Sequence, residues 1–228
     1  MASPRLRILD MIDEAEWARL RRMPRFLQPL EASTDPCVTC PGNCCMAQIR
    51  VTTVEALRIV LTLTLRFEDV VDVSRVGPEH TDYRPRVPLR DGPVVFQLKV
   101  TPGTGCLFLF HVGGRGRCSI HGLRPGPCRM FPFHVVMGRR EMQTGSQRLC
   151  PIGWVRTDAL EKRVARDVAQ FDKDLREEKR LVDAWVAADG GQKEFTEFLA
   201  FAIRRLAPAF GRDAEELLAP PRRRLGQR

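Results

Sequence analysis

The stretch CVTCPGNCC, residues 37–45, holds four of the eight cysteines of this 228-residue chain: Cys37, Cys40, Cys44 and Cys45. The other four are Cys106, Cys118, Cys128 and Cys150. Each group adjoins a glycine or proline or is separated from one by a single residue, as suits a backbone that turns sharply round a metal. So many thiols in this pattern indicate metal ligands rather than small buried side chains.

The spacing within the stretch carries further information. Cys37 and Cys40 form a Cys-x-x-Cys pair, which can place two sulfurs on one zinc ion or one iron-sulfur cluster. Cys44 and Cys45 are adjacent, and in an extended segment their side chains would point to opposite faces unless the turn is very tight. They therefore bind two different metal centres, or one of them is a ligand while the other is redox-active or lies next to the ligands. Eight thiols match two four-cysteine sites, but the pairing does not follow from sequence.

The composition predicts a folded protein, with 43% hydrophobic and 29% charged residues. The N-terminus lacks the apolar core of a signal peptide, and no run approaches the ~18 apolar residues of a membrane span. We therefore expect a cytoplasmic protein, where clustered cysteines are more often metal or redox groups than disulfides. The net charge of +9 leaves a nucleic-acid or acidic partner as an alternative, although the arginines are spread along the chain.

The hydrophobic patterns predict an α+β fold. Residues 8–23 read as an amphipathic helix ended by Pro24, and Thr52 with Glu55 stands in capping-box spacing at the start of a helix that anchors the cysteine loop. Three β-prone runs occupy residues 94–100, 106–112 and 131–137, separated by turn sequences. Residues 67–93 show no clear period and read as a long connection.

The C-terminal part is predicted to be helical. Apolar residues recur at helical spacing over residues 157–188 and 193–207, on either side of Gly190 and Gly191, which indicates an αα-hairpin. The expected architecture is a small cysteine-lined metal-binding core of short β-hairpins and loops, flanked by an N-terminal helix and this C-terminal hairpin. The expected units are a cysteine-cluster metal-binding domain at 1–155, the helical hairpin packed on it at 156–210, and a basic tail at 211–228.

Several motifs in their order along the chain resemble a known family. CVTCPGNCC, VTTVEALRI, GCLFLF and CSIHGLRPGPCRMFPF, followed by a late cysteine, resemble the cysteine-cluster proteins of the CxxCxxCC or YkgJ-like family, described as zinc- or iron-chelating. The resemblance covers residues 37–150 and implies a metal centre. His121 stands where the family usually has an aromatic residue, and it is either an extra ligand, a proton carrier or a packed histidine.

The metal is predicted to be an iron-sulfur cluster, with zinc as the alternative. Four thiolates on Zn²⁺ or on a [4Fe-4S]²⁺ core leave a charge of about −2. Arg115, Arg117, Arg124 and Arg129 lie near Cys118 and Cys128 in sequence; we expect Arg124 and Arg129, which fit the family motif, to donate to sulfur or offset that charge. Later cysteines are scattered rather than arranged as a second Cys-x-x-Cys pair, which favours one or two [4Fe-4S] clusters.

Three functions follow as hypotheses. The centre has a structural or redox role in a protein with an unidentified protein or small-molecule partner. Alternatively, it belongs to an enzyme, because the flagellin lysine methylase carries a similar cysteine module and is associated with an iron-sulfur cluster and S-adenosylmethionine. The third alternative is a zinc module that binds nucleic acid, which rests mainly on the positive charge.

Overall fold

The structure is a computed structural model that describes residues 42–77, 79, 85–112, 115–136, 139–142 and 158–218. The predicted helix at 8–23 and three of the candidate ligands, Cys37, Cys40 and Cys150, lie outside these ranges. The described residues combine helices with small antiparallel strand pairs, which confirms the α+β class.

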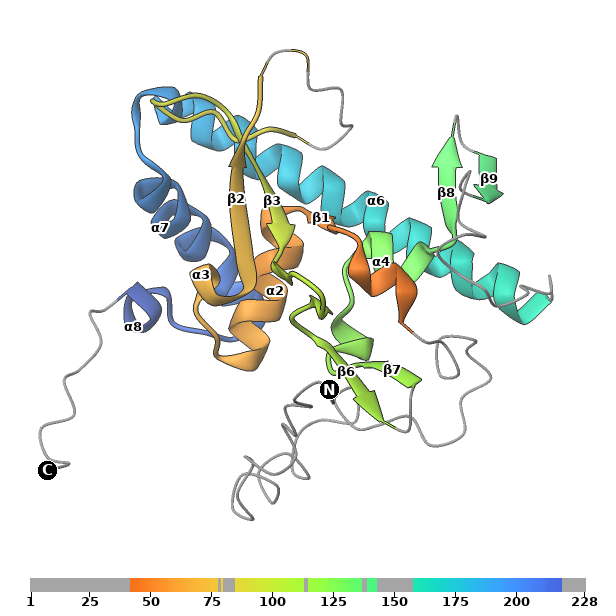
Figure 1. The fold of residues 1–228 in the computed structure, drawn as a ribbon. Coiled ribbons are helices and arrows are strands. Elements are labelled where there is room, and N and C mark those ends of the chain that lie inside the picture. Colours follow the sequence, from red (N-terminus) through yellow and green to blue (C-terminus); the bar gives the residue numbers. More distant parts are fainter. Residues whose placement is uncertain are drawn as a thin grey trace, which may run out of the picture.

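A three-stranded antiparallel sheet lies at the centre of the fold (Figure 1). Its strands are β1 (Arg50–Val51), β2 (Val71–Arg75) and β3 (Val94–Leu98), with β3 between the other two. β3 is buried along almost its whole length, as its apolar sequence predicts. β2 and the short helix α3 (Phe67–Val70) fall in the segment predicted as a connection. The prediction missed β2 because only the first of its five residues is buried, so its apolar pattern is weak.

Three separate hairpins and short helical turns carry the cysteine region. The paired strands are β4 (Val100–Thr101) with β5 (Gly105–Cys106), β6 (Leu109–Val112) with β7 (Arg115–Cys118), and β8 (Phe133–Val136) with β9 (Arg139–Met142). The turns are the 3₁₀ helices η4 (Asn43–Met46) and η5 (His121–Leu123) and the α-helix α4 (Gly126–Met130). Each β-prone run of the sequence therefore contains at least one strand.

Helix α2 (Thr53–Leu63) follows the cysteine loop and begins with the predicted capping box. The Glu55 backbone N–H donates to Thr52 Oγ1 at 3.1 Å, and the Thr52 N–H donates to Glu55 Oε2 at 2.9 Å. Most of this helix is buried. Glu55 itself is only 1% exposed, so it lies inside the protein rather than on a solvated helix end.

Two long helices form the C-terminal half, at nearly the bounds predicted from the sequence. They are α6 (Asp158–Ala187) and α7 (Phe195–Leu206), joined through the 3₁₀ turn η6 (Gly190–Gln192) and followed by η7 (Ala207–Phe210) and α8 (Ala214–Leu218). α8 lies within the segment that the sequence predicted as a tail. None of the helices in the described ranges has the length and apolar character that crossing a membrane requires.

Aromatic contacts join the sheet to these helices. Phe96 of β3 stacks on Phe198 of α7 with ring centroids 6.1 Å apart, and Phe198 meets Trp185 of α6 edge-on at 5.3 Å. The Trp185 indole N–H donates to the Pro88 carbonyl at 2.8 Å. One buried apolar cluster thus draws on α2, β3, α6 and α7 together. In Figure 1, α7 lies beside the C-terminal half of α6, whereas α4 lies beside its middle.

Candidate metal centre

Five of the eight candidate cysteine ligands lie in described segments, and they come from four elements. Cys44 and Cys45 lie in η4, Cys106 ends β5, Cys118 ends β7, and Cys128 is in the middle of α4. All five are partly buried, and none forms a disulfide. The structure therefore leaves these sulfurs available as thiols or thiolates.

Two glycines allow the cysteine loop to sit directly on the hairpins. A Cβ on Gly105 would lie 2.7 Å from Met46 Sδ and 2.9 Å from the Cys45 carbonyl oxygen, and one on Gly42 would lie 3.0 Å from Leu109 Cδ1. Both glycines have positive φ, 85° and 88°, which other residues rarely adopt. The η4 loop is thus seated against the strand that ends in Cys106 and the hairpin that ends in Cys118.

The adjacent cysteines lie in a tight turn rather than an extended segment. The Cys45 N–H donates to the Gly42 carbonyl at 2.9 Å and the Ala47 N–H to the Cys44 carbonyl at 3.2 Å. A hydrogen bond with Cys45 is the main cause that raises the pKa of the Cys44 thiol, followed by burial. Because the two side chains contact each other, the geometry does not divide them between opposite faces, as an extended chain would.

The thiols of the four elements lie within electrostatic reach of one another. Burial raises the pKa of Cys128 well above its ordinary value, and Cys118, Cys106 and Cys44 raise it further. Burial likewise raises the pKa of Cys106, with Cys44 adding to the effect. The shifts favour the protonated thiols of Cys44, Cys106 and Cys128, and a bound cation would offset the charge of their thiolates.

Arg124 is a cationic side chain that acts electrostatically on these thiols. It lowers the pKa of both Cys44 and Cys128, against the stronger influences that raise them. Its Nε donates to the His121 carbonyl at 3.1 Å, which fixes the guanidinium beside η5. The placement suits the predicted role of Arg124 in offsetting thiolate charge.

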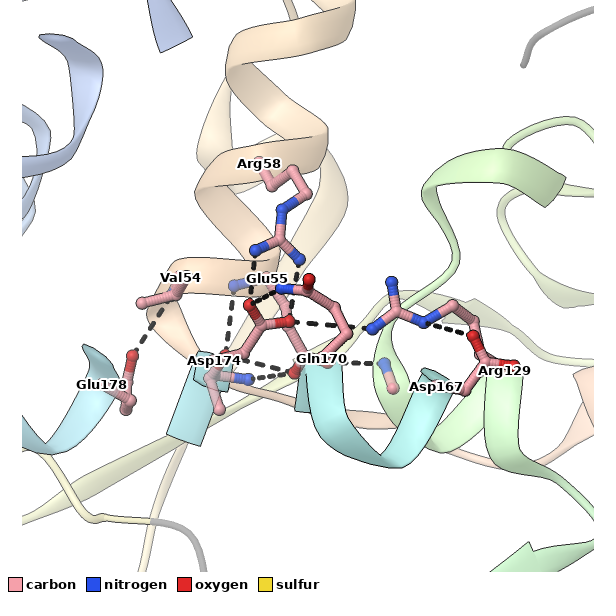
Figure 2. Close-up of polar contacts among 10 residues, drawn as sticks. Val54, Glu55, Arg58, Arg129, Asp167, Gln170, Asp174 and Glu178 are labelled. Atoms are coloured by element: carbon pink, nitrogen blue, oxygen red, sulfur yellow. Dashed lines mark hydrogen bonds and ion pairs between the residues drawn. The ribbon is translucent and has the colours of Figure 1, made fainter. Parts of the chain in front are cut away.

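Arg129 contacts two carboxylates of α6, which the sequence did not indicate. Its guanidinium lies 3.7 Å from Asp167 Oδ1 and 3.7 Å from Asp174 Oδ2, both on α6 (Figure 2). Its Nε and Nη2 are buried and form no hydrogen bond with the residues that the structure describes. The contacts of Arg129 thus join α4 to α6.

A network of buried carboxylates surrounds this contact, and sequence reasoning missed most of it. Asp174, fully buried, accepts from Arg58 Nη2 at 2.6 Å and Nη1 at 2.9 Å, and from Gln170 Nε2 at 2.8 Å (Figure 2). Glu178 accepts from Thr53 Oγ1 at 2.7 Å and from the Val54 N–H at 3.1 Å. In the sequence these acids look like the polar side of an amphipathic helix.

Glu55 has a second partner besides its capping box. Its Oε1 accepts a hydrogen bond at 2.5 Å from the N–H of Gly126, which is the first residue of α4. In the sequence, the capping-box spacing was a sufficient explanation for Glu55. It therefore gave no sign of the hydrogen bond to Gly126, 71 positions further along the chain.

The sulfur atoms of the described cysteines are of the kind that zinc and iron bind, but the described residues alone do not form a metal site. No three His, Cys, Asp or Glu side chains in the described segments stand together as a group that could hold a metal ion. The chemistry of the set is nevertheless that of zinc or iron-sulfur sites: partly buried thiols with a guanidinium beside them. The remaining predicted ligands, Cys37, Cys40 and Cys150, lie outside the described residues.

Fold and site together define a cysteine-cluster protein, in which short β-hairpins and turns gather thiols beside a helical half. The chain belongs to the CxxCxxCC family, described as "Putative zinc- or iron-chelating domain", whose model matches residues 36–151. That match includes all eight cysteines and confirms the resemblance seen over residues 37–150. No curated protein and no solved structure matches the chain.

Proposed function

We propose that this protein holds one or two iron-sulfur clusters of the [4Fe-4S] type through its cysteine thiolates, in a structural or redox role. The observation that carries the proposal is that η4, β5, β7 and α4 bring the thiols of Cys44, Cys106, Cys118 and Cys128 near enough to influence one another electrostatically. In the metal-free protein ionisation of these thiols is unfavourable, because burial opposes it and neighbouring thiolates would repel. Metal binding would offset that repulsion and make the thiolate form favourable.

The arrangement of the sulfurs favours a cluster. A structural zinc site often uses two Cys-x-x-Cys turns, whereas the cysteines of the described segments are one adjacent pair and three single residues on separate elements. A cluster accepts ligands from scattered elements. Zinc remains the second candidate, favoured by the description of the family, which names zinc and iron equally.

The residues would have distinct roles in such a centre. Cys44, Cys106, Cys118 and Cys128 are proposed ligands together with Cys37, Cys40 and Cys150, and Cys45 is a ligand or a hydrogen-bond partner of Cys44. When bound, an iron-sulfur cluster supplies reversible one-electron transfer. Arg124 would offset negative charge on the sulfurs and so favour their deprotonation. In the proposed organisation the centre belongs to residues 1–155, and the helical hairpin of 156–210 covers it on one side.

The test begins with anaerobic purification, followed by an absorption spectrum and iron, acid-labile sulfide and zinc assays on one sample. Equal amounts of iron and sulfide with a brown colour would support the cluster, and stoichiometric zinc in a colourless protein would support the second candidate. Cys118→Ser and Cys128→Ser should each lower the metal content, while the neighbouring Ser119→Ala should not. Full metal content in both cysteine variants would refute the assignment.

A further inference from the structure

The helix that carries Cys128 is too short to hold its own position. α4 has five residues, Gly126–Met130, and an isolated helix of that length is not stable in water. Its orientation must therefore come from contacts with other elements. The described contacts reach it from α6 and from strands β1 and β8, and one hydrogen bond reaches it from α2 (Figure 2).

The hydrogen bond from α2 is made by the carboxylate of Glu55, whose two oxygen atoms have different donors. Glu55 Oε2 accepts from the Thr52 N–H at 2.9 Å, while Oε1 accepts from the Gly126 N–H at 2.5 Å. The side chain is 1% exposed, so water does not compete for either bond. Glu55 thereby ties the first residue of the ligand helix to the first turn of α2.

The contact from α6 has an apolar part and a charged part. A Cβ on Gly126 would overlap the ring of Phe171, so the α4 backbone lies directly on that ring. One turn along α4, Arg129 lies 3.7 Å from both Asp167 and Asp174. Asp174 is itself fixed by the two hydrogen bonds from Arg58 of α2.

We propose that Glu55 and the Asp167–Arg129–Asp174 contact are positioning groups that hold α4 so that Cys128 presents its sulfur to the metal centre. This inference rests on the proposed function, and it makes the metal affinity depend on carboxylates that do not touch the metal. Residues that orient ligands through such contacts typically contribute about 10–100-fold in metal affinity. Cys128 lies between Gly126 and Arg129, so both anchors act on its own turn of backbone.

Glu55→Gln separates positioning from capping. A glutamine at this position can still complete a capping box, because its single carbonyl oxygen accepts from the Thr52 N–H. Its other terminal group is then an NH₂, a donor that faces the Gly126 N–H donor. The variant therefore retains the start of α2 and loses the tie to α4.

A matched control exists in α7. Glu197 completes a capping box of the same kind, accepting from the Glu194 N–H at 2.8 Å, in a helix without cysteines. Glu197→Gln makes the same chemical change at the same helix position, away from α4. It controls for a general effect of removing a capping carboxylate.

The experiment measures Co²⁺ and Zn²⁺ binding to the reduced full-length chain. Co²⁺ titration reports the number of bound thiolates through the sulfur-to-metal absorption band, and competition with Zn²⁺ gives the dissociation constant. We expect Glu55→Gln to weaken binding at least tenfold and to lose band intensity as Cys128→Ser does. Glu197→Gln should match the wild type in both readouts. If Glu55→Gln does not fold, Asp167→Asn, at a partly exposed position, is measured with the same two readouts.

Three outcomes would overturn the inference. Binding by Glu55→Gln within twofold of the wild type would exclude a positioning role and leave the proposed function intact. Weaker binding with undiminished thiolate absorption would show a general loss of stability instead of displacement of Cys128. A wild-type protein that binds neither ion, and contains no metal as purified, would refute the proposed metal centre and the inference with it.

Discussion

Glu178→Gln should make the protein more stable at pH 8 and remove a large part of its pH dependence. The carboxyl of Glu178 is 1% exposed, and burial raises its pKa from the ordinary 4.5 to about 7, against the lowering effect of its hydrogen bonds from Thr53 and Val54. Nearby Glu55 adds to the rise. The folded protein therefore binds a proton at Glu178 more tightly than the unfolded chain does.

The sign and size follow from that difference. Glu178 stabilises the fold fully below about pH 4.5, and this contribution is lost as the pH rises through about 7. The rise in pKa corresponds to about 3 kcal/mol at pH 8. Glutamine resembles the protonated carboxyl, and its carbonyl oxygen still accepts from the Val54 N–H. The variant should therefore exceed the free energy of unfolding of the wild type by less than about 1 kcal/mol near pH 5 and by about 3 kcal/mol at pH 8.

The assay is guanidinium denaturation followed by far-ultraviolet circular dichroism at pH 5, 6, 7 and 8, on both proteins. Taking the difference between them cancels the thiols and other groups that titrate equally in each. Exposed Glu216→Gln in α8 serves as a control and should show no trend with pH. A variant that is less stable than the wild type at pH 8, or a difference that does not change with pH, would refute the reasoning.

Two other substitutions test the helix contacts. Asp174→Asn leaves the guanidinium of Arg58 without its buried counter-charge and should lower the free energy of unfolding by about 3–5 kcal/mol, measured by denaturation; a loss below 1 kcal/mol would contradict this. Gly126→Ala places a methyl group within 2.6 Å of Phe171 Cγ and should cost about 1–3 kcal/mol, with reduced metal content. Gly191→Ala, which meets nothing within 4 Å, is its control, and equal effects of the two would argue against steric overlap.

The elements that the sequence predicted well are those with a strong local signal. The capping box of Thr52 and Glu55 is present, and the 3.6-residue period of α6 located that helix to within a residue or two. The apolar run of β3 likewise became the central strand. β2 was missed because its residues after Val71 are polar or exposed, so its pairing with β3 comes from the partner strand and leaves no pattern of its own.

The site was predicted in part for a similar reason. Cysteine spacing predicted a set of ligands, and the family match covers the span that contains them. The sequence did not indicate which charged side chains form ion pairs, because the partners lie on elements far apart in the chain. Arg129 lies beside Cys128 in sequence and contacts Asp167 and Asp174 in space, and Asp174 and Glu178 look like solvated positions of a helix in which both are buried.

The family match covers a shorter stretch of the chain than the one that folds together, because α2 packs against α6. The family match ends at residue 151, yet Arg58 and the first turn of α2 find their acceptors on Asp174 and Glu178. A fragment limited to residues 36–151 would leave a guanidinium and backbone N–H groups without acceptors and would expose apolar surface. We expect such a fragment to be insoluble alone and to be rescued by co-expression of the helices that follow it.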